Sequence, residues 1–334
     1  MPLTVNAGLE HSDQPYAIAT HHPPPDHTHK LAATMPLPLS SASKIASYAI
    51  HPIEPPAYFL AIEHGQAVHR INLINAWGPA IGTGTRVLEL GCGQGTCTQA
   101  LAEAVSSPSP SNAGHITAID PASPDYGAPF TLSQAQSHLT AGPIGPLITF
   151  HRADPVAFLN AIPAGTEPQW DVAVLAHCMW YFPSAKTLDE TLFALRGRVA
   201  RVCLAEWALH ATEPAASAHV LTALARATFE AHRSGSTENI QTLMSPREMK
   251  EAALRAGWKI ESEGIVVPEA ELSDGFWETR TVISEKFSED VEREVADDRV
   301  KAVLRSARDS VIAAAGGVKK VRSMDVWVAN LVPE

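Results

Sequence analysis

Cysteine is scarce in this sequence, and long apolar runs are missing. The 334 residues contain four cysteines and no Cys-x-x-Cys pair, which excludes a disulfide framework and the common zinc signatures. No apolar run approaches the ~18 residues that span a bilayer. The first residues also show no charged segment followed by an apolar one, as a secretory signal would. We therefore expect a cytoplasmic protein with no membrane partner and reduced thiols.

Positive charge is limited as well. Lys and Arg total 25 against 36 Asp and Glu, which gives a net charge of −11. Such a chain is not attracted to phosphate backbones in general, so we expect a small-molecule substrate and no nucleic acid. With 45% hydrophobic and 18% charged residues, the composition is that of a globular protein.

Proline, by contrast, is abundant: 26 prolines outnumber 20 glycines, and many lie in the first 40 residues. Proline interrupts helices and sheet ladders, so residues 1–40 are predicted to form a flexible arm. Five of the 15 histidines lie in this arm, four of them between residues 21 and 29. Without a fixed scaffold they make a weak metal site, and we expect no functional metal.

From residue 41 onward the hydrophobic pattern becomes regular. Residues 41–80 predict a helical cap whose main helix covers 57–76, and residues 81–334 predict one domain of alternating strands and helices. Such alternation indicates a largely parallel sheet covered on both faces. The expected strands are 86–90, 116–119, 147–150, 171–176, 199–205, 258–267 and 324–331. The helices expected between them are 96–105, 131–139, 156–161, 188–195, 217–232 and 246–256.

Residues 276–315 predict one or two amphipathic helices within an insertion at about 268–317. This insertion is interpreted as a lid or a dimer surface, which leaves a monomer and a homodimer both open.

A glycine-rich turn joins the first of these strands to the next helix. Its sequence is Glu89-Leu90-Gly91-Cys92-Gly93-Gln94-Gly95. Glycines permit a tight turn and the close approach of a ligand to the backbone. Thr96 stands where a dinucleotide fingerprint has its third glycine, and no Gly-Lys-Ser/Thr follows, as a Walker loop requires. The glycines alone also fit a purely structural turn.

The order Glu-x-Gly-x-Gly-x-Gly resembles the first motif of the class I S-adenosylmethionine-dependent methyltransferases. Asp120 ends the second expected strand, where the family places the acid that holds ribose hydroxyls. Asp154 follows the third strand, where the family often reads the adenine amino group. Trp170-Asp171 opens the fourth strand, as in the family's fourth motif. The resemblance covers about residues 80–334 and is to natural-product, small-molecule enzymes.

The resemblance implies a Rossmann-like α/β fold: seven mostly parallel strands, the last antiparallel, helices on both faces, an N-terminal helical cap and a C-terminal helical insertion. It also implies S-adenosyl-L-methionine as cofactor, S-adenosyl-L-homocysteine as product and no metal. The residues that it assigns to the cofactor are Glu89, Gly91, Cys92, Gly93, Gln94, Gly95, Asp120, Pro121, Asp154, Pro155 and His177. Taken singly, Asp120-Pro121 also fits a strand end, and Asp154-Pro155 fits a helix N-cap.

Candidate catalytic bases follow the fourth and fifth strands, because open α/β sheets bind ligands at the carboxyl ends of their strands. These candidates are His177, Glu206 and His210. For His177 the alternative is a histidine that only shapes its loop. The residues expected to line the substrate cleft are Tyr48, His64, Arg70, Trp180, Tyr181 and Trp207.

The expected reaction is methylation of a small molecule on oxygen, either a hydroxyl or a carboxylate. A base is needed only when the acceptor is protonated at the working pH. Methylation on nitrogen or sulfur is an alternative, as is a cyclase or rearrangement enzyme that binds the same cofactor without transferring its methyl group. A non-enzymatic binding protein is the remaining reading.

Overall fold

The computed structural model describes residues 37–52, 56–162, 168–233 and 238–334. Most of the predicted N-terminal arm, up to residue 36, lies outside these ranges. Seven strands form one sheet in the order β3-β2-β1-β4-β5-β7-β6. Their bounds are β1 Arg86–Leu90, β2 His115–Asp120, β3 Ile148–Arg152, β4 Val172–Ala176, β5 Val202–Trp207, β6 Trp258–Val266 and β7 Val326–Pro333.

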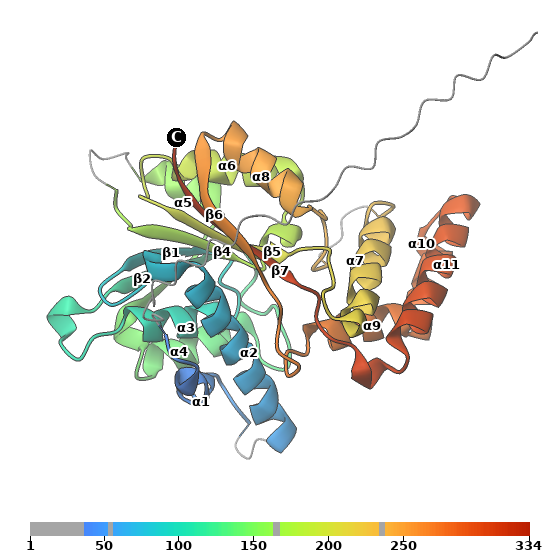
Figure 1. Cartoon of the computed structure of the whole chain (residues 1–334), viewed down its shortest axis with the longest axis horizontal. Coiled ribbons are helices and arrows are strands. Elements are labelled where there is room, and N and C mark those ends of the chain that lie inside the picture. The colour runs from blue at the N-terminus through green and yellow to red at the C-terminus, as the bar shows by residue number, and fades with distance from the viewer. Residues whose placement is uncertain (1–36, 53–55, 163–167, 234–237) are drawn as a thin grey trace, which may run out of the picture. The chain divides into compact units, whose positions relative to one another are not determined.

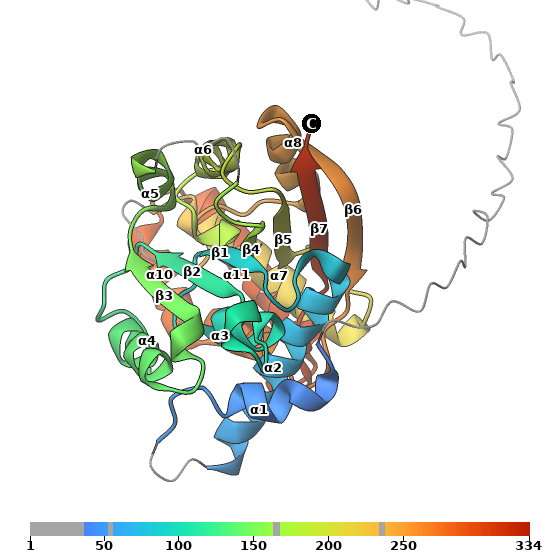
Figure 2. The ribbon, with the colours of Figure 1, turned by 90° about the vertical axis from the view of Figure 1, so that its left-hand side faces the viewer.

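Helices cover both faces of the sheet: α2, α3 and α4 lie on one face and α5, α6 and α8 on the other (Figures 1 and 2). No helix in the described ranges is long and apolar enough to cross a membrane. The helix bounds are α1 Ala42–Ala46, α2 Ala57–Ala76, α3 Thr96–Val105, α4 Leu132–Ala141, α5 Pro155–Ala161, α6 Ala185–Leu195, α7 Ser217–Glu230, α8 Pro246–Arg255, α9 Asp274–Ile283, α10 Glu285–Glu294 and α11 Asp298–Ala315.

The strand directions confirm the predicted Rossmann-like sheet. β1 pairs in parallel with β2 and β4, and β5 continues the parallel order. β7, the last strand in the sequence, runs antiparallel to both β5 and β6. The chain winds outward in opposite directions from β1 and β4, so the gap between the ends of these two strands is the topological switch point, where such sheets bind ligands.

The central strands are buried because their apolar runs are continuous rather than alternating. β4 reads Val-Ala-Val-Leu-Ala and is buried over its first four residues, while all six residues of β5 are buried. Strands covered on both faces have this composition. A polar residue inside such a strand is therefore conspicuous, and Glu206 in β5 is 1% exposed.

A second, smaller core holds four helices together at the end of the sheet where β5 stops, at the right of Figure 1. α7 packs against α9 and α11, and α10 completes the group. The sequence predicted one or two helices here, and the structure has three, α9 to α11. Two caps account for the difference: the Ser284 side chain accepts from Phe287 N at 3.3 Å to begin α10, and Asp297 caps α11.

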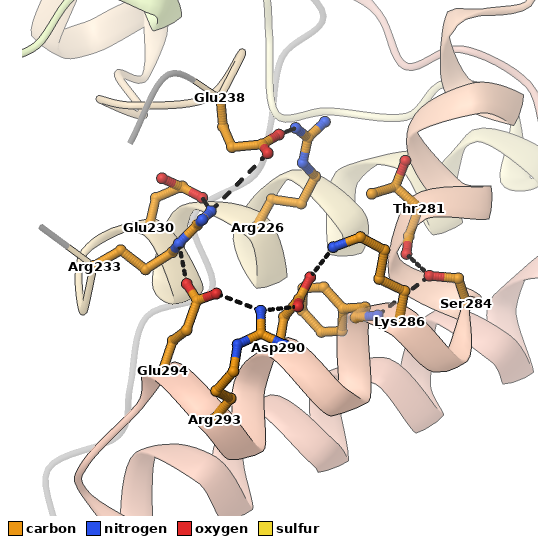
Figure 3. Close-up of polar contacts among 11 residues, drawn as sticks. Arg226, Glu230, Arg233, Glu238, Thr281, Ser284, Lys286, Asp290, Arg293 and Glu294 are labelled. Atoms are coloured by element: carbon orange, nitrogen blue, oxygen red, sulfur yellow. Dashed lines mark hydrogen bonds and ion pairs between the residues drawn. The ribbon is translucent and has the colours of Figure 1, made fainter. Parts of the chain in front are cut away.

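Ion pairs fasten the end of α7 to α10, as Figure 3 shows. Arg233, just after α7, pairs with Glu230 of the same helix at 2.7 Å and with Glu294 of α10 at 2.6 Å. Arg226 of α7 pairs with Glu238 at 3.0 Å. The helices of the second core, α7 and α9–α11, are called the helical unit below.

Candidate functional site

The glycine turn after β1 has a conformation that only glycine adopts easily. Gly91, Gly93 and Gly95 have φ values of +75°, +52° and +91°. A Cβ on Gly91 would lie 2.5 Å from the Cβ of Cys178, and one on Gly95 would lie 2.5 Å from a methyl group of Leu139. A Cβ on Gly93 would meet no atom within 4 Å. The turn is thus packed at both ends and open in the middle, which is the shape of a cradle for a ligand.

Asp120 and Glu89 flank this cradle. Asp120, at the end of β2, accepts the Gly93 N–H at 2.8 Å with one oxygen and the Ala122 N–H at 2.9 Å with the other. Glu89 is 2% exposed and accepts the Thr98 hydroxyl at 2.6 Å. Burial raises the pKa of Glu89 to about 7, so its charge near neutrality depends on what surrounds it.

The other residues assigned to the cofactor hold local structure. The Gln94 amide donates to the carbonyl of Phe130 at 2.6 Å and ties the turn to the loop before α4. Cys92 is buried, and burial raises the pKa of its thiol, so the thiol is unreactive. Pro121 follows Asp120 in an exposed loop.

Asp154 is exposed and caps α5. Its carboxylate accepts the Ala157 N–H at 2.8 Å, and Pro155 occupies the first turn of the helix. The carboxylate retains further lone pairs, and its role toward adenine stays a prediction. A cavity of about 470 Å³ lies close to Asp120, between α4 and the end of β3.

A second cavity, of about 460 Å³, opens at the carboxyl ends of β4 and β5. It is called the acceptor cavity below. It is next to the glycine turn, because Gly91 packs against Cys178, which directly follows the lining residue His177. The sheet supplies its floor, α2 one wall, and the helical unit the other. Its lining includes Arg70, His177, Trp180, Tyr181, Glu206, Trp207, Arg226, Glu238, Asp274, Trp277 and Glu278.

Two polar side chains on the floor of the acceptor cavity, His177 and Glu206, are joined from behind by the buried His69. The Nε2 atoms of His69 and His177 lie 2.9 Å apart, and His177 Nδ1 lies 3.5 Å from Glu206 Oε1. The Glu206 carboxylate is fixed by the backbone N–H groups of Met179 and Trp207, at 3.0 and 3.1 Å.

The charges of these groups follow from burial. Burial lowers the pKa of both histidines well below their usual range, and the charge of Arg70 lowers it further. Burial raises the pKa of Glu206 to about 7, although hydrogen bonds from the backbone oppose the rise. Both rings are therefore neutral at pH 7 and keep a nitrogen lone pair, which a general base requires.

His177 also has a strained backbone, with φ of +54°. The left-handed region is uncommon for residues other than glycine, and such strain concentrates at functional sites. This conformation turns the chain sharply at the end of β4, between the glycine turn and the acceptor cavity.

The sequence candidates divide between the acceptor cavity and other places. Arg70, Trp180, Tyr181, Trp207, His177 and Glu206 all line the cavity. Tyr48 does not line it, since its hydroxyl donates to Glu103 of α3 at 2.8 Å. His64 is exposed on α2. The His210 side chain is 65% exposed and bonds Asp325 at 2.7 Å, away from the cavity lining.

The sequence analysis missed several residues of the site: His69 of α2, which contacts His177, and the cavity residues Arg226 of α7 and Asp274 and Glu278 of α9. One signal for α2 was available, because Gln66, His69 and Arg70 are spaced three and four residues apart and share one helix face. No comparable signal marks α7 or α9, whose cavity residues are separated from the motifs by long stretches of sequence.

A metal site is not apparent in the described ranges. No group of three or more His, Cys, Asp or Glu side chains is placed there to hold a metal ion.

Two known proteins are similar to this chain in sequence. The chain is 33% identical over 280 residues to Methyltransferase phomM of Diaporthe leptostromiformis, an alignment that covers 73% of this chain and 72% of that protein. Methyltransferase phomM′ of the same organism is 32% identical over the same length and the same shares of both chains.

Among solved structures, a cyclopropane-fatty-acyl-phospholipid synthase-like protein from Lactobacillus casei is similar, with a TM-score of 0.74 and 28% identity. The match covers 88% of this chain and 99% of that protein. No family model matches the chain.

Proposed function

Because the chain belongs to the class I S-adenosylmethionine-dependent methyltransferases, we propose that it methylates an oxygen, a hydroxyl or a carboxylate, of a small molecule held in the acceptor cavity. The observation that carries this proposal is the adjacency of the glycine turn and the cavity: Gly91 packs against Cys178, which directly follows the cavity residue His177. A donor at the turn and an acceptor in the cavity are then neighbours, and proximity is the main contribution of such a site to catalysis.

The glycine turn suits the cofactor on the evidence of its own geometry. The open space beside Gly93 admits a ligand against the backbone, and Glu89 and Asp120 offer carboxylate oxygens on either side. When bound, S-adenosylmethionine supplies a methyl group on a positively charged sulfur. These residues would hold the cofactor, with Asp120 toward its ribose hydroxyls.

A hydroxyl acceptor must lose its proton, and the His69–His177 pair supplies the acceptor for it. One N–H and one lone pair form the hydrogen bond between the two Nε2 atoms, so one of the two buried Nδ1 atoms carries the second N–H and the other keeps the lone pair that takes up a proton. The Glu206 carboxylate, 3.5 Å from His177 Nδ1, stabilises the imidazolium that results. A carboxylate acceptor is already ionised and needs no base.

A second candidate acceptor is an amine. Glu238, Asp274 and Glu278 line the acceptor cavity beside Trp180 and Trp207. Carboxylates and aromatic faces both attract ammonium groups. These carboxylates already accept hydrogen bonds from Gln66 and Arg226, which is why we rank the amine second.

The test supplies the purified protein with methyl-labelled donor and a panel of phenols, alcohols, carboxylic acids, amines and thiols. Labelled O-methyl product is the expected result. Labelled N-methyl product alone selects the second candidate, and a product of unchanged mass selects a cyclase or rearrangement enzyme. Tight donor binding with no product from any class overturns the proposal.

The role of the histidine pair is tested with His177→Asn, since asparagine tolerates the left-handed conformation. For a hydroxyl acceptor kcat is expected to fall by about 100-fold or more, the usual contribution of a general base. Donor affinity should change little. Tyr48→Phe, which removes a hydroxyl outside the cavity, is the control and should retain full activity.

A further inference from the structure

Arg70 is a buried cation that the described structure leaves without a partner. It is 9% exposed and borders the acceptor cavity from α2. Within residues 37–52, 56–162, 168–233 and 238–334, no hydrogen bond or ion pair reaches its guanidinium, and its Nε is fully buried. Buried charges in proteins are normally paired, and a guanidinium has five N–H donors to satisfy. The side chain is therefore placed to bind an anionic group of a ligand.

Three carboxylates lie near enough to Arg70 to feel its charge: Glu89, Glu206 and Asp274. None comes within ion-pair distance, and each is engaged elsewhere: Glu89 accepts a hydroxyl, Glu206 two backbone N–H groups, and Asp274 a glutamine amide. Burial raises the pKa of all three, and Arg70 lowers it. The reduced ionisation of Glu89 and Glu206 near neutrality leaves room for another negative charge beside the guanidinium.

The position of Arg70 favours one ligand group. It lines the acceptor cavity, and the adjacent His69 contacts His177, which directly precedes Cys178, the residue against which Gly91 packs. The side chain thus borders the cavity on the side of the glycine turn, and its charge acts on Glu89 as well as on Glu206. The end of S-adenosylmethionine that carries the sulfur is an α-amino acid, with one carboxylate and one ammonium group. The unpaired guanidinium of Arg70 complements the carboxylate of this amino acid, and a nearby buried carboxylate complements its ammonium group.

We propose that Arg70 binds the amino-acid carboxylate of the methyl donor. This inference rests on donor binding at the glycine turn, as the proposed function does, but not on any particular acceptor. A guanidinium pairs with a carboxylate through two parallel N–H···O bonds, which fixes orientation as well as affinity. Arg70 would therefore set the direction in which the donor lies across the switch point.

The test compares two ligands that differ only in this carboxylate: S-adenosylmethionine and decarboxylated S-adenosylmethionine. Affinities are measured by calorimetry on the full chain, with no acceptor present. Arg70→Gln is expected to weaken S-adenosylmethionine about 10- to 100-fold, the range for a hydrogen bond between charged groups. It should change the affinity for the decarboxylated ligand less than about threefold. Arg70→Lys is expected to fall between, because an ammonium cannot form the two parallel bonds.

Arg280→Gln is the matched control, since it removes the same charge from an exposed position on α9. It should change neither affinity. Equal losses for both ligands in Arg70→Gln overturn the inference, because they indicate a structural effect. Unchanged donor affinity with a raised KM for a carboxylate-bearing acceptor also overturns it and assigns the guanidinium to the acceptor. Carboxylate discrimination without methyl transfer to any acceptor supports the inference and rejects the proposed function.

Discussion

At the scale of single residues, Gly93 and Gly197 form a natural pair for testing the cofactor site. Both have positive φ, +52° and +71°, and a Cβ on either would meet no atom within 4 Å. Gly93→Arg and Gly197→Arg should therefore cost a similar ~1–2 kcal/mol of backbone strain. Only Gly93→Arg should abolish donor binding, because its side chain fills the cradle. Calorimetry with S-adenosylmethionine measures this, and unchanged affinity in Gly93→Arg would place the donor elsewhere.

His219 makes the folding stability depend on pH, and its burial determines the direction of that dependence. Its Nδ1 accepts the Met324 N–H at 3.0 Å, and burial lowers its pKa to about 3. In the unfolded chain the histidine binds a proton below its ordinary pKa of about 6.5, whereas the folded protein does not. Folding stability from this residue is therefore complete above that pH and is lost as the pH falls.

His219→Gln, which retains a hydrogen-bond acceptor, should remove this dependence. Relative to the variant, the wild type is expected to lose about 2 kcal/mol of unfolding free energy between pH 6.5 and 5. Urea denaturation of both proteins across this range measures the difference. A difference that stays constant with pH would show that His219 titrates normally in the folded state.

Some residues of the candidate site could be predicted from the sequence and others could not, for physical reasons. Glu89, the glycines and Asp120 could be predicted because they are contiguous with strands whose apolar runs are unmistakable. His69 could not, because its role comes from a ring 108 residues away that lies 2.9 Å from its own. His210 was a reasonable candidate by position, yet its side chain turns outward to Asp325.

At the scale of elements, the spacing of apolar residues predicts the buried face of α2 but not that of α7. For α2 the predicted bounds, 57–76, match the structure, and the apolar residues Ala67, Ile71 and Ile74, at helical spacing, are buried. In α7, by contrast, the apolar residue Leu224 is 45% exposed. That helix instead buries polar side chains, because it stands between the acceptor cavity and the helical unit.

Arg226 is the polar residue on which the packing of α7 depends. It is 7% exposed and pairs with Glu278 of α9 and with Glu238. Arg226→Gln leaves Glu278, whose side chain is 20% exposed, without its cation, and breaking a buried pair costs about 3–5 kcal/mol, so we expect a loss toward the lower end of that range. Arg293→Gln, whose side chain is 60% exposed in the network of Figure 3, should cost less than ~1 kcal/mol. Chemical denaturation of both variants measures the contrast, and equal losses would contradict it.

At the scale of the whole molecule, the two largest hydrophobic cores support different parts of the structure. The larger one fixes the sheet and the glycine turn, and the smaller one fixes the helical unit. Leu304 is fully buried in the smaller core, and Leu304→Ala is expected to cost about 2–5 kcal/mol. Since the residues proposed to hold the donor flank Leu90 and Cys92 of the larger core, donor affinity should persist while acceptor binding weakens.

Hydrogen exchange over α9–α11 together with donor calorimetry tests this division. Val303→Ala, at a neighbouring position that is 58% exposed, is the control and should change stability by no more than ~0.5 kcal/mol. A parallel loss of donor affinity in Leu304→Ala would mean that the two cores act as one.

The overall architecture was the most predictable level. All seven strands were located, because buried parallel strands have continuous apolar runs. The antiparallel direction of the last strand came from the family resemblance, and pairing confirms it. What sequence could not predict is that α7 belongs with α9–α11, since that grouping depends on side-chain contacts between segments about fifty to ninety residues apart.

One hydrogen bond between the two walls of the acceptor cavity has a thermodynamic consequence. The Gln66 amide of α2 donates to Asp274 of α9 at 2.7 Å, one turn of helix before Arg70. A ligand that immobilises α2 is expected to order the opposite wall through this bond. If donor and acceptor bind on either side of it, as proposed, linkage requires each to strengthen the other by the same factor. The affinity of each ligand measured with the other present should then exceed its affinity measured alone.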